Sequence, residues 1–274
     1  MEHRQMTAYL TDNHIHSRFS ADSEADMRDM VEAARRKGFR LITFTDHIDW
    51  DFPVEDEVFD IDLPSYDIEI QRLRREFSGK IRILKGVELG LQPHLRERYA
   101  ELTKSEGFDY VIGSRHLVGN MDPYYPETFA GKTVDEIYRQ FFRETLECLE
   151  TDPDIDALGH LDYIVRYGHP LGFRFAYSDF ADIIDEILKV IIAKGIALEV
   201  NTCGLRKTID HTNPHPDIVR RYRELGGEMI TIGSDAHKMS HVGFGVETAE
   251  EMLKDAGFDY IVYFEKRKPQ FIRL

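Results

Sequence analysis

Residues 9–16 read YLTDNHIH, and this short stretch decides the fold. Its first half has the β-branched and aromatic residues of a strand, and its second half turns polar, so we predict a strand that ends in polar side chains. Residues 24–38 follow with apolar side chains at helical spacing, and Gly38 is a natural helix stop. The stretch therefore begins a βα unit.

The same unit recurs along the chain. Candidate strands lie at residues 9–16, 41–47, 81–89, 110–116, 157–162, 196–202 and 229–235. Helical periodicity covers residues 24–38, 93–106, 134–150, 180–194 and 214–226. A helical segment at 249–256 and an extended segment at 259–264 would close the sheet. Seven units predict an α/β protein, a distorted seven-stranded TIM-like barrel forming a single domain over residues 1–274.

A doubly wound open sheet would show the same rhythm and is the alternative fold. The glycine-rich dinucleotide signature expected after its first strand is absent from this sequence. No linker-like or low-complexity segment divides the 274 residues. The barrel is therefore the favoured architecture.

The net charge of the chain limits the kinds of partner that it can bind. With 50 Asp and Glu against 35 Lys and Arg, the formal net charge is -15, which opposes binding to nucleic acid or to an anionic membrane. The first nine residues lack the apolar core of a signal peptide, and the longest apolar stretch, residues 187–200, is interrupted by two lysines. We expect a cytoplasmic protein with no nucleic-acid or membrane partner.

Polar residues gather at the ends of the predicted strands. The motifs in chain order are DNHIH (12–16), TDH (45–47), GVE (86–88), GSRH (113–116), GHLD (159–162) and GSDAH (233–237). Six of the 12 histidines lie there. In parallel strands these ends meet at one edge, so the side chains would converge.

Such a set of side chains indicates metal binding. The candidate ligands are His14, His16, Asp22, His47, Glu88, His116, His160, Asp235 and His237. Taken singly, each has an ordinary explanation, such as a helix cap or a buried histidine, but their shared edge favours a metal cluster. Imidazoles with carboxylates and without thiolates suit Zn, Fe or Mn. Nine ligands exceed the needs of one ion, so we expect two or three divalent ions, some of them bridged by Glu88 or Asp235.

Taken together, these motifs resemble those of the PHP (polymerase and histidinol phosphatase) superfamily over essentially the whole chain. The resemblance implies a distorted seven-stranded barrel with a trinuclear metal centre. It assigns His14, His16, Glu88 and Asp235 to one metal, Glu88, His116 and His160 to a second, and Asp22, His47 and His237 to the third. Some relatives have a histidine where this chain has Asp22, and an aspartate can also coordinate a metal.

Within the superfamily the chain most resembles the histidinol-phosphate phosphatases. The stretches that carry this likeness are EVNTCGLRK (199–207), HPDIVRRYRELGG (215–227), ITIGSDAHKMSHVGFG (230–245) and FEKRKPQFI (264–272). The likeness implies hydrolysis of L-histidinol phosphate to L-histidinol and phosphate in histidine biosynthesis. Another small phosphate ester or a nucleotide is the alternative substrate.

The residues themselves agree with a small phosphate monoester as substrate. Guanidinium and ammonium groups that could bind phosphate lie near the metal edge, although solvated surface cations are the ordinary alternative: Arg206, Arg166, Arg115 and Lys207. We expect a hydroxide bridging the metals to attack phosphorus in line. Glu88 would hold the metals, Asp235 would orient the nucleophile, and Asp162 is a candidate for proton transfer.

Three other functions are open at this stage. An amidohydrolase would have H-x-H after its first strand but a bridging lysine after the fourth, where this chain has His116. A nuclease or polymerase-associated domain would need a basic surface to bind nucleic acid. A metal-binding module would use the same ligands without catalysing a reaction. The loop at residues 49–62 has seven acids and no Lys or Arg, so it is either a lid for a cationic substrate or a solvated loop.

Overall fold

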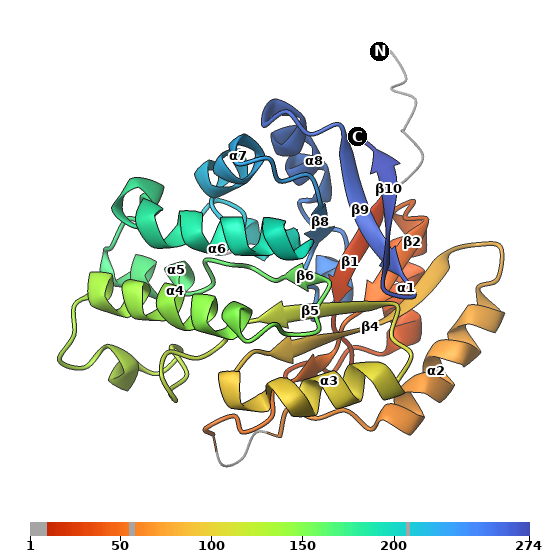
Figure 1. Cartoon of the computed structure of the whole chain (residues 1–274). Coiled ribbons are helices and arrows are strands. Elements are labelled where there is room, and N and C mark those ends of the chain that lie inside the picture. The colour runs from red at the N-terminus through yellow and green to blue at the C-terminus, as the bar shows by residue number, and fades with distance from the viewer. Residues whose placement is uncertain (1–9, 55–57, 207–208) are drawn as a thin grey trace.

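The computed structural model describes residues 10–54, 58–206 and 209–274 (Figure 1). Seven parallel strands form the main sheet in the order β1-β2-β4-β5-β6-β7-β8. They are β1 (Thr11–Ile15), β2 (Leu41–Phe44), β4 (Arg82–Gly90), β5 (Tyr110–Ser114), β6 (Ala157–Leu158), β7 (Ala197–Asn201) and β8 (Ile230–Gly233). The short strand β3 (His47–Ile48) also pairs with β4, so the predicted strand at 41–47 is divided in two.

The sheet curls until its first and last strands meet. Ile15 and Ala236 form an isolated parallel bridge, and the backbone N–H of His16 donates to the Ala236 carbonyl at 2.9 Å. Gly233 permits this approach, because a Cβ at that position would lie 2.3 Å from the Cβ of His14. The predicted distorted, seven-stranded α/β barrel is confirmed.

Helices cover the outside of the barrel (Figure 1). They are α1 (Met27–Arg36), α2 (Leu63–Glu76), α3 (Arg96–Ser105), α4 (Val134–Glu150), α5 (Val165–Gly168), α6 (Ala181–Lys194), α7 (Pro216–Glu224) and α8 (Val246–Asp255). Helix α2 was not predicted from the sequence, and it begins where Asp62 caps its first turn. Among the described residues, no helix is both long enough and apolar enough to span a membrane.

The last extended segment does not close the sheet, contrary to the prediction. It forms β9 (Tyr260–Glu265), which pairs antiparallel with β10 (Lys268–Arg273) in a separate two-stranded sheet. Phe264 of β9 stacks on Tyr110 at the start of β5, with ring centroids 5.3 Å apart. Val262 and Phe264 share an apolar cluster with Ala157 and Ala197, the first residues of β6 and β7. The hairpin therefore packs at the end of the barrel where the strands begin.

The strands are buried on both faces, as parallel strands between a barrel core and outer helices should be. Every residue of β1, β2, β5, β7 and β8 is buried. The burial extends into the polar residues that end the strands, because Asp12, His14 and Glu88 are 0 % exposed. This rigid edge positions the site.

Candidate metal centre

The nine predicted ligands converge at the end of the barrel where the strands finish. His14 lies in β1, His47 in β3 and Glu88 in β4, and the others lie in the loops that follow β1, β5, β6 and β8. Contacts of 4.0 Å or less link His14, His16, Asp22, His47, Glu88, His116, His160, Asp235 and His237 into one cluster. Of these nine, Asp22 alone is exposed.

Glu88 lies at the centre of this cluster. Its Oε2 faces three ring nitrogens: His14 Nε2 at 3.0 Å, His47 Nδ1 at 3.2 Å and His16 Nε2 at 3.4 Å. Its Oε1 faces two others: His160 Nε2 at 2.9 Å and His116 Nε2 at 3.3 Å. Because the two oxygens face different groups of imidazoles, the carboxylate is suited to bridge two cations.

The geometry of His14 and His16 is suited to a bound cation. His14 Nδ1 lies 2.5 Å from Glu199 Oε1, and His16 Nδ1 lies 3.1 Å from the hydroxyl of Ser20, which donates to Asp46 at 2.8 Å. When both Nδ1–H groups donate, both Nε2 atoms carry lone pairs, and these atoms lie only 2.9 Å apart. Two lone pairs beside a buried carboxylate repel one another, so the pocket fits a metal ion. Such outer partners commonly orient metal-binding histidines.

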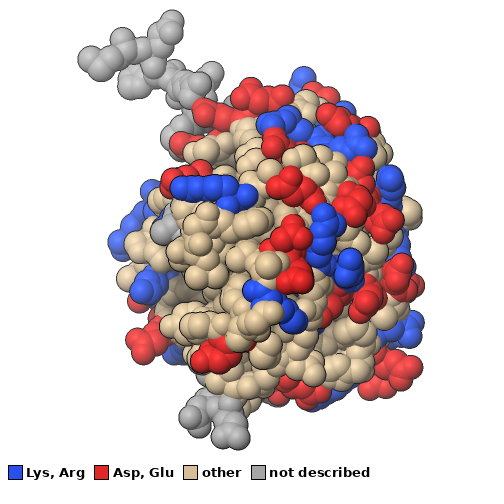
Figure 2. All heavy atoms as spheres, turned by 90° about the vertical axis from the view of Figure 1, so that its left-hand side faces the viewer, with Lys and Arg blue, Asp and Glu red and all other residues tan. Residues whose placement is uncertain are grey.

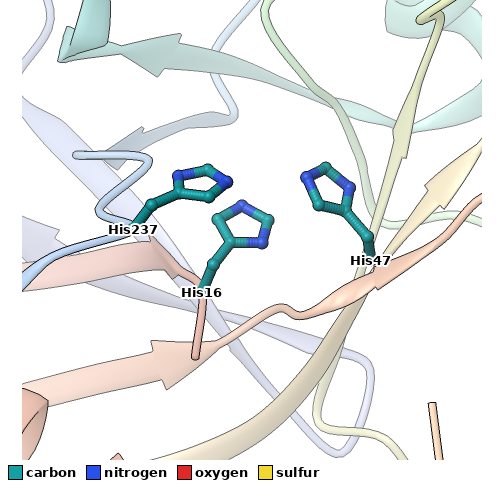
Figure 3. A group of neighbouring side chains, drawn as sticks. All are labelled: His16, His47 and His237. Carbon is teal, nitrogen blue, oxygen red and sulfur yellow. The ribbon is translucent and has the colours of Figure 1, made fainter. Parts of the chain in front are cut away.

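A second group of imidazoles lies beside the first, and Figure 3 shows His16 between His237 and His47. The ring of His16 stacks on both neighbours, with centroids 4.1 Å from His237 and 4.2 Å from His47. Asp22 Oδ2 lies 2.9 Å from His237 Nε2 and 3.8 Å from His47 Nε2. One ring nitrogen from each of the three histidines lies within 4.8 Å of the other two. This group is suited to hold a further ion, with Asp22 at its solvent side.

Asp235 joins the groups from the β8 side. Its Oδ1 lies 3.4 Å from His16 Nε2 and 3.3 Å from His237 Nδ1. Its backbone has φ +53°, a left-handed conformation that aspartate and asparagine tolerate better than most residues. Arg206 stabilises this turn, because its guanidinium donates to the carbonyls of Ser234 at 2.7 Å and Asp235 at 2.9 Å.

The ionisation of the cluster favours cations. Burial raises the pKa of Glu88, but the rings of His14 and His47 outweigh it and hold that pKa well below its usual value. Burial, His237 and His47 lower the pKa of His16 to about 3. Burial also lowers the pKa of His47, yet Glu88 and Asp22 raise it to about 9. Without metal, protons on some imidazoles balance the buried carboxylates.

This balance predicts how stability depends on pH. Asp49 raises the pKa of His116 to about 10 against the effect of burial, and the pKa of His47 is about 9. The stabilisation from these raised values is fully present below pH 6.5 and is lost as the pH rises towards 9 and 10. A bound divalent cation such as zinc would take the place of these protons, so the melting temperature gained on adding one zinc equivalent to chelator-treated protein should increase from pH 6.5 to 9. A gain that stays constant over this range would contradict the proton balance.

Two of the predicted phosphate-binding residues lie near the cluster. Arg206 holds the backbone that carries Asp235, and its guanidinium carbon is 5.5 Å from the centre of the Phe244 ring. Arg166 lies over the ring of Tyr163 at 4.2 Å, and its Nη2 donates to the sulfur of Cys203 at 3.1 Å. The buried Nε of Arg166 has no hydrogen-bond partner among the described residues.

Arg115 and Asp162 have structural contacts that the sequence analysis did not foresee. The guanidinium of Arg115 donates to the carbonyls of Leu91 and Gly119 and pairs with Glu144 on α4 at 2.7 Å. We therefore do not retain it for phosphate binding.

Asp162 is 0 % exposed, and both of its oxygens are engaged by the segment before α7. One accepts from Asn213 Nδ2 at 2.6 Å and the other from the His215 backbone at 2.8 Å. It is therefore a poor candidate for proton transfer. Lys207 lies outside the described residues.

Two carboxylates of the site received no role from the sequence. Glu199, in β7, contacts His14 and accepts from the backbone N–H of His160 at 3.0 Å. Asp49 contacts His116 Nδ1 at 2.7 Å. The spacing gave a signal for Asp49, because residues two apart in an extended segment face the same side, and Asp49 follows His47 by two.

The surrounding surface carries both signs of charge. Figure 2 views the molecule from the side towards which β4 and β5 run, and acidic and basic side chains are interspersed over that face. The -15 net charge of the sequence is thus not concentrated in a single acidic surface in this view.

The chain is similar to known proteins over most of its length. A model of the PHP domain family matches residues 12–203. A probable histidinol-phosphatase of Clostridium acetobutylicum is 36% identical over 257 residues, 93% of this chain and 97% of that protein. The histidinol-phosphatase of Lactococcus lactis subsp. lactis is 33% identical over 261 residues, 94% of this chain and 95% of that protein.

A solved structure extends the likeness to the fold. The crystal structure of histidinol phosphate phosphatase from Lactococcus lactis, complexed with zinc, L-histidinol and phosphate, has a TM-score of 0.87 and 31% sequence identity. The match covers 95% of this chain and 98% of that one. By the extent of these matches, the chain belongs to the PHP domain family.

Proposed function

We propose that this protein is a metal-dependent phosphomonoesterase that hydrolyses L-histidinol phosphate to L-histidinol and phosphate. The observation that carries the proposal is the likeness, over nearly the whole of both chains, to a phosphatase crystallised with zinc and both products. Three similar proteins at 31–36% identity are named histidinol-phosphatase or probable histidinol-phosphatase. The reaction would serve histidine biosynthesis.

Two or three divalent ions would occupy the candidate centre. His14, His16 and Glu88, with Asp235, form one set, and Glu88, His116 and His160 form a second. His47 and His237, with Asp22, form the third. Zinc is the favoured metal because it is bound in the similar phosphatase, and iron or manganese would suit the same nitrogen and oxygen ligands. When bound, such ions supply Lewis acidity and lower the pKa of water so that it becomes a nucleophile at neutral pH.

The chain's own residues would bind and orient the phosphate. Arg166 presents a buried guanidinium whose Nε has no described partner, so this nitrogen is available to a phosphoryl oxygen. Arg206 fixes the turn at Asp235 and adds positive charge there. Asp235 reaches two imidazoles with Oδ1, and Asn201 donates to its Oδ2 at 3.3 Å, so the carboxylate is held in position to orient an attacking water.

The test is a phosphate-release assay with purified protein that has been stripped of metal and reloaded with zinc. The substrates are L-histidinol phosphate, a sugar phosphate, a nucleoside monophosphate and p-nitrophenyl phosphate at equal concentrations. We expect the highest kcat/KM with L-histidinol phosphate and no turnover without metal. Equal kcat/KM values for L-histidinol phosphate and p-nitrophenyl phosphate would still indicate a phosphoesterase but would contradict L-histidinol phosphate as its specific substrate.

Replacing Arg166 by Ala should lower kcat/KM for L-histidinol phosphate by about 10- to 100-fold, because a charge-assisted hydrogen bond to phosphate would be lost. Zinc content should not change, because among the described residues no hydrogen bond or ion pair joins Arg166 to a candidate ligand. Arg143→Ala is the matched control, since Arg143 is exposed on α4. An R166A variant with wild-type kcat/KM would show that Arg166 does not bind substrate.

A further inference from the structure

Asp49 lies between two of the candidate metal ligands, although it follows the strand-end motif and begins the acidic loop. Its Oδ1 lies 2.7 Å from His116 Nδ1, and its Oδ2 lies 3.3 Å from His47 Nδ1. The residue is 5 % exposed, and its backbone N–H donates to the carbonyl of Phe59 at 3.0 Å. The carboxylate is therefore buried and held at the base of the loop.

The two nitrogens of His116 face different carboxylates. Nδ1 faces Asp49, whereas Nε2 lies 3.3 Å from Glu88 Oε1, on the side of the central cluster. If Asp49 accepts the Nδ1–H, the lone pair of the neutral ring is on Nε2 and points towards Glu88 and His160. An anionic acceptor also makes the ring a stronger metal ligand. Asp49 thus fixes both the tautomer and the direction of His116.

Gly90 provides the space that Asp49 occupies. A Cβ at position 90 would lie 1.6 Å from Asp49 Oδ1 and 2.4 Å from its Cγ. The strand has little freedom to move away, because the Tyr99 hydroxyl donates to the Gly90 carbonyl at 2.8 Å. Gly90 is also paired in the sheet with Ser114, two residues before His116. Any side chain at position 90 must therefore displace the carboxylate of Asp49.

We propose that Asp49 is a positioning residue for the metal centre and that Gly90 makes its placement possible. Asp49 acts through His116 and does not itself bind the metal. The inference rests on the metal centre under the proposed function, and it assigns roles to two residues outside the nine predicted ligands. It also explains why the loop at residues 49–62 begins with a buried acid.

The alternative role for Asp49 is that of a direct ligand, because Asp49, His47 and His116 also have ligand atoms within 4.8 Å of one another. The two roles make different predictions. Loss of a direct ligand lowers the number of zinc ions bound at saturation. Loss of a positioning residue weakens zinc binding but leaves that number unchanged.

The test compares Asp49→Asn, Asp49→Ala and Gly90→Ala with the wild-type protein. Asp51→Asn is the matched control, because Asp51 is exposed on the same loop and contacts His94, which is not a candidate ligand. Zinc affinity is measured by competition with a chromogenic chelator, and zinc per chain by elemental analysis at saturation. The His116 tautomer is read from long-range ¹H–¹⁵N spectra, with the resonance assigned by His116→Gln. Circular dichroism confirms that each variant is folded.

We expect zinc binding to weaken by about 10- to 100-fold in D49A, as for the loss of other outer partners of metal-binding histidines. D49N should weaken it less, because the amide oxygen still accepts a hydrogen bond without the charge. G90A should resemble D49A, D51N should resemble wild type, and zinc per chain at saturation should be unchanged throughout. His116 should carry its proton on Nδ1 in zinc-loaded wild type.

Three results would overturn the inference: wild-type zinc affinity in D49A, fewer zinc ions per chain in D49A and D49N, or a proton on Nε2 of His116 in the zinc-loaded wild type. If D49A and G90A are unfolded, D49N decides, because it is nearly isosteric. None of these measurements uses a phosphate ester. The inference can therefore fail while wild-type protein hydrolyses L-histidinol phosphate, and it can hold if the substrate proves different.

Discussion

Glu88→Gln should lower phosphate release from L-histidinol phosphate by about 10³-fold or more. Glutamine has the shape of glutamate but lacks its charge, and its amide NH₂ would face imidazole nitrogens that Glu88 now contacts at 2.9–3.4 Å. Because Glu88 is shared by two groups of ligands, its replacement would disturb both metal sites. Several kcal/mol of transition-state stabilisation would then be lost. Zinc per chain should also fall, as measured by elemental analysis after dialysis.

The matched control for this variant is Glu101→Gln, because Glu101 is exposed on α3. It should retain both zinc and activity. Since the substitution at position 88 is isosteric, its circular dichroism spectrum should match the wild type. An E88Q variant that keeps its zinc and its turnover would show that Glu88 does not bridge metals.

Asp235→Asn should lower kcat by about 10²-fold or more and change KM little. Asparagine tolerates the left-handed backbone at φ +53°, so the turn after β8 should persist and the loss should report the carboxylate. That carboxylate lies 3.4 Å from His16 Nε2 and 3.3 Å from His237 Nδ1, where it would bind metal and orient the nucleophile. Steady-state kinetics on L-histidinol phosphate measures the effect.

The chain offers a close control in Asp210→Asn. Asp210 also has a left-handed backbone, with φ +58°, and it is exposed. D210N should therefore keep wild-type kinetics. If D235N had an unchanged kcat, or if D210N lost as much activity as D235N, the assignment of Asp235 would be wrong.

The sequence predicted which of the nine candidate residues come together because these residues are tied to strand ends. Parallel strands bring their ends to one edge whatever the loops do, so His14 and Glu88 could be placed together although 74 positions separate them in the chain. The helix α2 was missed although Tyr66, Ile70 and Leu73 are buried at helical spacing. The predicted connection from residue 48 to 66 covered its first turn, and the rest of the helix was given no element.

Side-chain direction was the part that the sequence could not supply. Arg115 precedes His116, yet its guanidinium pairs with Glu144 away from the cluster, because neighbouring residues in an extended segment point to opposite sides. The side-chain contacts of the acidic loop at residues 49–62 could not be predicted from the sequence either. Asp49 contacts His116, Asp51 contacts His94, and Asp62 caps α2, so these three acids have three different local partners. Glu55, Asp56 and Glu57 lie outside the described residues.

Glu88 is expected to join two metal ions at the ends of the barrel strands. An anomalous difference map from crystals of zinc-loaded protein, recorded at the zinc absorption edge, would locate these ions. We expect at least two peaks that share Glu88, one beside His14 and His16 and the other beside His116 and His160. A single peak, or peaks that do not contact Glu88, would contradict it.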